Sequence, residues 1–286
     1  MASVDVPVAL LGYGTVGAAV DRLLTEGAEE IERATGHRLR VVRALVRDAA
    51  KERRFAPADG VLTTDFAAIR DDPSIAVVAE VMGGVEPTGG YVLDLLRAGK
   101  AVVLPTDTVY GLAATPYRSD PVLRLYKLKQ REETEPIALL AGDVEMLLEC
   151  VPELRGRSGT IVRALLPGPY TLVLPNPARR YRWLTGSRPD TIGLRVPDLP
   201  EPAAQVLAAV GAVAATSANA HGGPDPRRVE DVPEELRSRC CAVVDAGELP
   251  GTPSTVIDFT GPEPQVVRDG AASPAEAIER ALAALG

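Results

Sequence analysis

The segment at residues 104–112, LPTDTVYGL, constrains this chain most strongly. The apolar run before it, residues 101–104, predicts a buried strand, and Pro105 ends that strand because proline cannot donate a hydrogen bond to a sheet. Two threonines, an aspartate and a tyrosine follow within five residues, at the predicted carboxyl end, where open α/β sheets bind ligands. Gly111 would let the chain turn away without placing a side chain in the site. The segment therefore predicts a binding site, although an ordinary polar turn after a strand would have the same composition.

Composition places the chain among soluble globular proteins. Its 286 residues suffice for one large domain or two ordinary ones, with 46% hydrophobic and 24% charged residues. An aromatic content of 4% and a net charge of −8 argue against a broad nucleic-acid-binding surface. The spacing of Cys150, Cys240 and Cys241 suits neither a disulfide framework nor a zinc site, which favours a reducing compartment. With no signal-peptide pattern and no apolar run of about 18 residues, we expect a cytoplasmic protein without a membrane span.

The scarcity of histidine limits the chemistry further. A Ser-His-Asp triad or a site with several histidines would need His37 or His221, and neither lies in a supporting motif. The sequence also lacks a Gly-x-Ser-x-Gly elbow and a Walker phosphate loop. We therefore expect anions to be bound by lysine, arginine, hydroxyl groups and backbone amides.

The N-terminal segment has the pattern of a dinucleotide-binding unit. Residues 6–11 predict a strand, the sequence GYGTVG follows at once, and residues 18–24 predict a helix. In that setting the glycines let a pyrophosphate approach the helix N-terminus. Further strands are predicted at residues 39–46 and 75–81. The cofactor of such a unit would be NADP(H). The three glycines of the turn, Gly12, Gly14 and Gly17, would bind it, and Arg47 after the second strand would accommodate its 2′-phosphate.

This stretch resembles the N-terminal half of homoserine dehydrogenase through the segments ALLGYGTVG, RALVRD and VVAEVMGGVEP. The remaining cofactor-domain strands and the substrate half of that family have no counterpart in the sequence. We interpret residues 1–86 as a structural appendage or fusion remnant, and residues 87–286 as a second domain. NADP(H) binding by an incomplete Rossmann unit and an NADP-dependent homoserine dehydrogenase-related protein are the alternatives.

The helix predicted at residues 121–130 closes with a basic cluster at residues 127–131. Inside a regular helix, Lys129 and Arg131 would point about 200° apart. Both can reach one ligand only if the helix ends or unwinds near Lys129. Lys127 and Arg131 are the pair that would share a helical face. A solvated basic helix end near the negative pole of the helix dipole is the simpler interpretation.

Later segments supply further polar groups. The segment LPGPYTLVL at residues 166–174 predicts a rigid turn leading into a strand. Arg195 interrupts an apolar strand, where its charge would be costly unless paired, and an anionic ligand is the natural partner. The strand at residues 212–215 precedes Thr-Ser-Ala-Asn, and an amphipathic helix is expected at residues 274–285.

The second domain resembles the YrdC-like family, the threonylcarbamoyl-AMP synthases. The resemblance rests on PTDTVYGL, Lys-x-Arg, PGP-x-T, TIGLRVP, Ser-Ala-Asn, STVID and VVRDG, which occur in this order over about 200 residues. The family often has Lys-Pro-Leu where this chain has Glu135-Pro136-Ile137, and a second serine where it has His221. The implied fold class is α/β, with an incomplete Rossmann-like unit followed by a YrdC-like twisted open sheet.

The resemblance implies a nucleotidyltransferase that condenses L-threonine, bicarbonate and ATP into threonylcarbamoyl-AMP and pyrophosphate, for tRNA t6A modification. A tRNA threonylcarbamoyl transferase would use the product, and Mg²⁺ would bridge the triphosphate with few protein ligands. A double-stranded-RNA- or nucleotide-binding module without synthase activity, contacting tRNA directly, is the alternative from another class. The implied catalytic residues are Lys129, Arg131 and Arg195, and the implied substrate-binding residues are Thr106, Thr108, Tyr110, Lys127, Thr191, Ser217, Asn219, Ser254 and Arg268.

Overall fold

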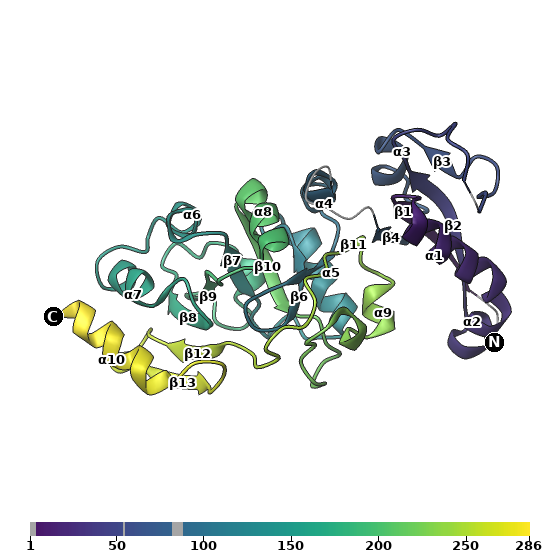
Figure 1. The fold of residues 1–286 in the computed structure, drawn as a ribbon. Coiled ribbons are helices and arrows are strands. Elements are labelled where there is room, and N and C mark those ends of the chain that lie inside the picture. Colours follow the sequence, from purple (N-terminus) through teal and green to yellow (C-terminus); the bar gives the residue numbers. More distant parts are fainter. Residues whose placement is uncertain (1–3, 54, 82–87) are drawn as a thin grey trace.

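The computed structural model of the protein describes residues 4–53, 55–81 and 88–286 and contains two β-sheets, one of four strands and one of nine (Figure 1). The four-stranded sheet comes from the N-terminal part of the chain and the nine-stranded sheet from the rest. This α/β architecture is the predicted fold class. The predicted boundary between Glu86 and Pro87 lies outside the described residues.

The four-stranded sheet is parallel throughout. Its elements are β1 (Val4–Leu11), α1 (Thr15–Glu26), α2 (Ala28–Thr35), β2 (His37–Leu45), β3 (Leu62–Thr63), α3 (Ala67–Arg70) and β4 (Val77–Glu80). The strand order is β3-β2-β1-β4, and all three strand pairs are parallel. This order is how a Rossmann-type sheet begins, as the sequence predicted.

The glycine-rich turn joins β1 directly to α1. A Cβ atom at Gly17 would lie 2.3 Å from the carbonyl oxygen of Gly12, so α1 can pack this closely against the turn only with glycine there. A Cβ at Gly14 would meet no heavy atom within 4 Å. Gly17 therefore serves packing, whereas Gly14 faces open space.

The nine-stranded sheet carries most of the remaining elements. They are α4 (Thr88–Arg97), β5 (Val102–Pro105), β6 (Tyr110–Ala114), α5 (Ser119–Lys129), β7 (Ala138–Ala141), α6 (Val144–Cys150), α7 (Arg157–Leu165), β8 (Tyr170–Pro175), η1 (Arg182–Leu184), β9 (Thr191–Arg195), α8 (Glu201–Val210), β10 (Ala212–Ser217), η2 (Val229–Asp231), α9 (Glu234–Arg237), β11 (Ala242–Val243), β12 (Thr255–Asp258), β13 (Gln265–Arg268) and α10 (Pro274–Leu285). The strand order is β11-β5-β6-β10-β7-β9-β8-β12-β13.

This larger sheet is mixed, which changes where a ligand can bind. β10 is antiparallel to both β6 and β7, whereas β7 and β9 are parallel. In such a sheet the carboxyl ends of neighbouring strands do not gather at one edge. The sequence predicted a site at the carboxyl end of a strand, as in open parallel sheets. In this mixed sheet we expect the site on a face of the sheet instead.

Two sets of side chains alternate along these strands and form two packed layers. On one face, residues such as Tyr110, Leu112 and Leu194 pack in a core with α5, α7 and α10. On the other face, apolar residues such as Leu104 and Leu140 pack under α4 and α8. The apolar cluster with α4 and α8 includes strands β5, β6, β7, β10 and β11.

The segment after β5 also folds differently from its prediction. Gly111 lies inside β6, where it pairs with Leu104 on one side and Ser217 on the other. The turn falls at residues 106–109 instead, because β5 and β6 form an antiparallel hairpin. Gly111 thus keeps a strand surface free of a side chain and does not end the strand.

Candidate active site

A cavity of about 480 Å³ opens beside the larger sheet. Neighbouring strands line it with very small residues, at Gly111 of β6, Ala215 of β10, Ala138 of β7 and Gly193 of β9. Because a strand turns alternate side chains to opposite faces, these four positions leave room above the sheet without disturbing the core beneath it. The polar and charged lining residues are Thr106, Lys129, Arg131, Thr171, Thr185, Ser187, Arg188, Thr191, Arg195, Thr216, Ser217, Asn219, His221, Asp225, Ser254, Asp258 and Arg268.

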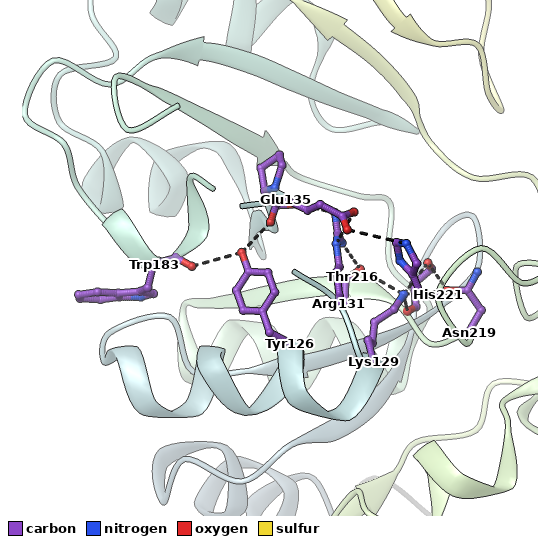
Figure 2. Close-up of polar contacts among 10 residues, drawn as sticks. Tyr126, Lys129, Arg131, Glu135, Trp183, Thr216, Asn219 and His221 are labelled. Atoms are coloured by element: carbon purple, nitrogen blue, oxygen red, sulfur yellow. Dashed lines mark hydrogen bonds and ion pairs between the residues drawn. The ribbon is translucent and has the colours of Figure 1, made fainter. Parts of the chain in front are cut away.

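The end of α5 brings two of the predicted cations together (Figure 2). The helix ends at Lys129, and Gln130 adopts the left-handed conformation with φ of 51°, which redirects the chain before Arg131. Lys129 Nζ donates to the carbonyl oxygen of Ser217 at 2.7 Å and to Asn219 Oδ1 at 2.8 Å. Arg131 Nη1 donates to Thr216 Oγ1 at 3.1 Å. The predicted end of the helix near Lys129 is confirmed.

Lys127 does not belong to this arrangement. Its side chain is exposed on α5 and does not line the cavity, whereas Lys129 is buried. Lys127 and Arg131 would share a helical face only if the helix continued, and α5 ends before Arg131. Lys127 is therefore withdrawn from the substrate-binding set.

Burial changes the ionisation of Lys129. Burial first, and then the positive charge of Arg131, lowers the pKa of the Lys129 amine from 10.5 to about 8. The hydrogen bonds to Ser217 and Asn219 hold the amine in place. Near neutral pH this amine is a buried cation close to its titration point.

Arg195 has a protein partner that sequence reasoning missed. Its Nη2 lies 2.7 Å from Asp107 Oδ1 and 3.3 Å from Thr108 Oγ1. Within the described part of the chain, Arg195 Nε and Asp107 Oδ2 are both buried without a hydrogen-bond partner. Burial raises the pKa of the Asp107 carboxyl and lowers the pKa of the Arg195 guanidinium, and each group opposes the shift of the other. The expected anionic partner of Arg195 is thus supplied, in this structure, by Asp107.

The residues of the PTDTVYGL segment separate into layers. Thr106 lines the cavity, and its Oγ1 donates to the carbonyl oxygen of Val109 at 2.7 Å. Thr108 is fully buried behind it, with the two hydroxyl oxygens 3.0 Å apart. Tyr110 lies in the core on the opposite face, and its hydroxyl donates to Asp245 Oδ1 at 2.8 Å. The expectation that Thr108 and Tyr110 contact the ligand is corrected, because strand alternation turns Tyr110 away and Thr108 lies beneath Thr106.

The opposite wall comes from the last two strands. Arg268 donates from Nε to the Ser254 carbonyl oxygen and from Nη2 to Ser254 Oγ, both at 3.0 Å. Ser254 Oγ lies 2.8 Å from Thr171 Oγ1. Thr191 also lines the cavity and donates to the carbonyl oxygen of Arg188 at 3.1 Å. The predicted Ser254, Arg268 and Thr191 are thus brought to one cavity with Lys129.

Sequence reasoning missed several lining groups or their supports, among them Asp107, Thr171, Arg188 and Thr216. Asp107, Thr171 and Thr216 lay inside segments that had been recognised, so their position beside other polar residues was a usable signal. Arg188 had no such signal, and its partner is distant in sequence. Arg188 Nη1 lies 2.8 Å from Asp258 Oδ2.

The cavity keeps an excess of positive charge. Arg131, Arg188 and Arg195 each form an ion pair, with Glu135, Asp258 and Asp107 respectively. Among the described residues, the lining cations Lys129 and Arg268 form no ion pair. Lys129 and Arg268 are therefore the groups most available to an anionic ligand.

Two further features concern cofactors. Within residues 4–53, 55–81 and 88–286, no cluster of three His, Cys, Asp or Glu side chains is arranged to hold a metal ion. A second cleft follows the glycine-rich turn and is lined by Gly12, Gly14 and Arg47, whereas Gly17 packs behind it. The same cleft carries three more cations, Arg22, Lys51 and Arg53. No helix in the described residues is long and apolar enough to cross a membrane.

Comparison with known proteins agrees with this geometry. A sequence profile of the Sua5/YciO/YrdC family, described as telomere recombination, matches residues 94–270. The chain belongs to this family. A profile described as the NAD-binding domain of homoserine dehydrogenase matches residues 12–114, so the two matches overlap across α4, β5 and β6.

Individual family members resemble the same part of the chain. A putative threonylcarbamoyl-AMP synthase of Mycobacterium tuberculosis is 34% identical over 179 residues, which is 62% of this chain and 82% of that protein. The structure of Pyrococcus abyssi Sua5 complexed with L-threonine is similar with a TM-score of 0.63 and 31% identity, covering 71% of this chain and 59% of that chain. Escherichia coli YciO has a TM-score of 0.60 and 25% identity, covering 66% of this chain and 92% of that chain.

The lowered pKa of Lys129 predicts pH-dependent anion binding. Below about pH 8 the amine is charged, and above it the amine is neutral and no longer attracts an anion. We expect the affinity of the cavity for sulfate, whose charge is constant in this range, to fall as pH rises from 7 to 9. Calorimetric titration at several pH values measures this. Lys129→Gln should remove the dependence and Lys127→Gln, an exposed cation of the same helix, should keep it; an unchanged profile in Lys129→Gln would contradict the assignment.

The buried Arg195–Asp107 pair predicts a stability effect. Arg195→Ala would leave the Asp107 carboxylate buried and unpaired, at a cost of about 3–5 kcal/mol in the free energy of unfolding. The double variant Arg195→Met, Asp107→Asn should regain most of this loss, because no buried charge remains. Urea denaturation measures both, with Arg163→Ala, which breaks the exposed ion pair with Glu145, as the control. Equal stability of the single and double variants would show that the loss in Arg195→Ala does not come from leaving the Asp107 carboxylate buried and unpaired.

Proposed function

We propose that this chain is a threonylcarbamoyl-AMP synthase, which condenses L-threonine, bicarbonate and ATP to threonylcarbamoyl-AMP and pyrophosphate. The observation that carries the proposal is the convergence of Lys129, Arg131, Ser217 and Asn219 on one wall of the cavity, opposite Ser254 and Arg268. Family membership and the similarity to a protein solved with L-threonine support it. The product would be consumed by a tRNA threonylcarbamoyl transferase in t6A modification.

The reaction needs several anions in one place. The threonine amine attacks the carbon of bicarbonate and forms a carbamate with loss of water. A carbamate oxygen then attacks the α-phosphorus of ATP, and the bond to the leaving pyrophosphate breaks. Nucleotidyl transfer of this kind depends on positioning and on stabilising charge, with little covalent work for the protein. The proposed reaction therefore does not require a catalytic histidine held in a hydrogen-bonded triad.

We assign roles to the lining residues on this basis. Lys129 and Arg268, which form no ion pair with any described residue, bind the phosphate groups. Arg131 offers the N–H groups that its contacts with described residues leave free. Arg195, held by Asp107, faces the carbamate and carboxylate end. The hydroxyl and amide groups that surround threonine, the carbamate and the nucleotide are Thr106, Thr191, Ser217, Asn219 and Ser254, with Thr108 supporting Arg195 from behind.

Magnesium would enter with ATP as part of the substrate. Mg²⁺ retains several waters and is usually bound by one or two carboxylates together with substrate phosphates. Among the described residues, Asp225 and Asp258 are the carboxylates that line the cavity, and Asp258 is already paired with Arg188. Asp225 would therefore hold the metal together with the substrate phosphates. A cytoplasmic location belongs to the same proposal.

A second proposal concerns the N-terminal unit, with the division at residues 1–86 and 87–286. The cleft at Gly12 and Gly14 has the arrangement that admits a pyrophosphate, and Arg47 lies where it would meet a 2′-phosphate. The four-stranded sheet ends at β4 on one side, so it supplies only part of a dinucleotide crevice. We propose that this unit binds NADP(H) weakly and does not reduce a substrate.

The synthase proposal predicts that pyrophosphate release from ATP requires both L-threonine and bicarbonate, with serine a poor substitute. Lys129→Ala should cost about 2–4 kcal/mol of transition-state stabilisation, as for the loss of a preorganised charged donor. A coupled pyrophosphate assay on the full chain measures both. Release with ATP alone, or none with all three substrates, would reject the synthase.

The N-terminal proposal predicts NADPH affinity no tighter than roughly 0.1 mM, near −5 kcal/mol, because half a crevice buries little of the ligand. Gly14→Val should abolish what binding remains, since its side chain would occupy the open space beside the turn. NADPH fluorescence titration tests this, with the same titration of the wild type as the reference. Micromolar binding lost in Gly14→Val would instead reveal a working cofactor site.

A further inference from the structure

Glu135 joins two sides of the cavity that are far apart in sequence (Figure 2). Its Oε2 accepts a hydrogen bond from Arg131 Nε at 3.0 Å. Its Oε1 lies 3.8 Å from His221 Nε2, on the segment that follows β10. Glu135 is half-exposed, and His221 lines the cavity while remaining largely exposed. One carboxylate thus contacts both the segment after α5 and the segment after β10.

These contacts fix the orientation of the Arg131 guanidinium. Besides the bond to Glu135, Nη1 donates to Thr216 Oγ1 at 3.1 Å and Nη2 donates to the Pro136 carbonyl oxygen at 2.9 Å. A guanidinium has five N–H donors, so these three bonds leave two for a ligand. A planar donor held at three points presents the remaining two in one orientation, which suits bidentate contact with a phosphate.

The backbone of Glu135 is firmly placed. Its carbonyl oxygen accepts a hydrogen bond from Tyr126 Oη at 2.8 Å, and Tyr126 is a buried residue of α5. A Cβ at Gly186 would lie 2.3 Å from the carbonyl oxygen of Thr134, so the segment before Glu135 packs directly against the backbone at Gly186. The backbone from which the Glu135 carboxylate extends is therefore tied to the same helix that ends at Lys129.

We propose that Glu135 is a positioning residue, which orients Arg131 for an anion, with His221 of the segment after β10 as a weaker partner of the same carboxylate. The proposal rests on the proposed function only in that the anion is taken to be the phosphate chain. Electrostatics alone makes the opposite prediction, because removing a carboxylate beside an anion site should tighten anion binding. The sign of the change therefore separates the two explanations.

Inorganic pyrophosphate is the probe, titrated by calorimetry into the full chain at constant pH and salt. We expect Glu135→Gln to weaken binding about tenfold or more, the range for losing a hydrogen bond to a charged group. In an Arg131→Ala background the same substitution should change the affinity less than about twofold, because its effect passes through Arg131. Glu145→Gln, which also removes a carboxylate paired with an arginine, is the matched control and should leave binding unchanged.

The result that overturns the proposal is pyrophosphate binding in Glu135→Gln that is equal to or tighter than in the wild type. An equal loss in the presence and absence of Arg131 would also overturn it, because Glu135 would then act elsewhere. His221→Gln should give a smaller loss that is not additive with Glu135→Gln, and an unchanged affinity would remove His221 from the arrangement. Absence of pyrophosphate binding to the wild type would reject both the anion site and its positioning residue.

A second readout distinguishes this inference from the synthase proposal. The Arg131 side-chain Nε–H resonance in ¹⁵N NMR should exchange slowly with water in the wild type and rapidly in Glu135→Gln, whatever reaction the protein catalyses. If the wild type binds pyrophosphate in a Glu135-dependent way but releases none from ATP, threonine and bicarbonate, the synthase proposal fails and the positioning role stands. If the wild type releases pyrophosphate from ATP with threonine and bicarbonate, and Glu135→Gln has an unchanged KM for ATP, only the positioning role fails.

Discussion

The cavity depends on four very small residues that lie side by side across the sheet. Ala215 pairs with Ala138, and a Cβ at Gly193 would lie 3.9 Å from Ala138 Cα. Gly111 pairs with Ser217, two residues along β10 from Ala215, so the small positions cluster over β6, β10, β7 and β9. Where the same face carries larger residues, such as Leu104, it is packed under α4 and α8. A close-packed interior leaves few voids, so a cavity of this size has to be maintained by side chains that are too small to fill it. The size of the strand residues therefore decides which part of the face is core and which part is site.

The walls of that cavity depend on a single backbone change at Gln130. A helix that continued through Arg131 would direct Lys129 and Arg131 apart, whereas the left-handed residue between them brings both to Thr216 and its neighbours. Three of the arginines are then matched by carboxylates, and the protein keeps its surplus charge on Lys129 and Arg268. This arrangement limits self-repulsion in the empty cavity while it preserves attraction for an anion.

The sequence predicted the elements of the fold and the members of the main wall. Lys129, Ser217 and Asn219 belong to short motifs whose residues stay together after folding, so the polar groups of each motif could be recognised locally. The errors arose from strand pairing. Tyr110 was expected in the site, and it lies in the opposite core because β6 continues through Gly111 and alternates its side chains.

Contacts between distant segments were beyond local reasoning. Asp107 and Arg195 are 88 residues apart, and Glu135 and His221 approach each other only because β10 lies beside β7. Their charges indicated that some partner was needed, but not which one. Predicting those partners requires the strand order, and a mixed sheet of nine strands permits too many orders for periodicity to select one.

The alternation along β9 limits how the length of this protein can change during evolution. Arg195 pairs with Leu140 on the cavity face, while Leu194 sits between Leu139 and Leu172 in the core. Insertion or deletion of one residue within β9 would exchange the two, placing a leucine in the cavity and an arginine in the core. The chain between β8 and β9, residues 176–190, lies outside the strands, so a change of length there would not exchange faces, but it would displace Thr185, Ser187 and Arg188 of the cavity wall. Length variation among relatives should therefore spare the five residues of β9.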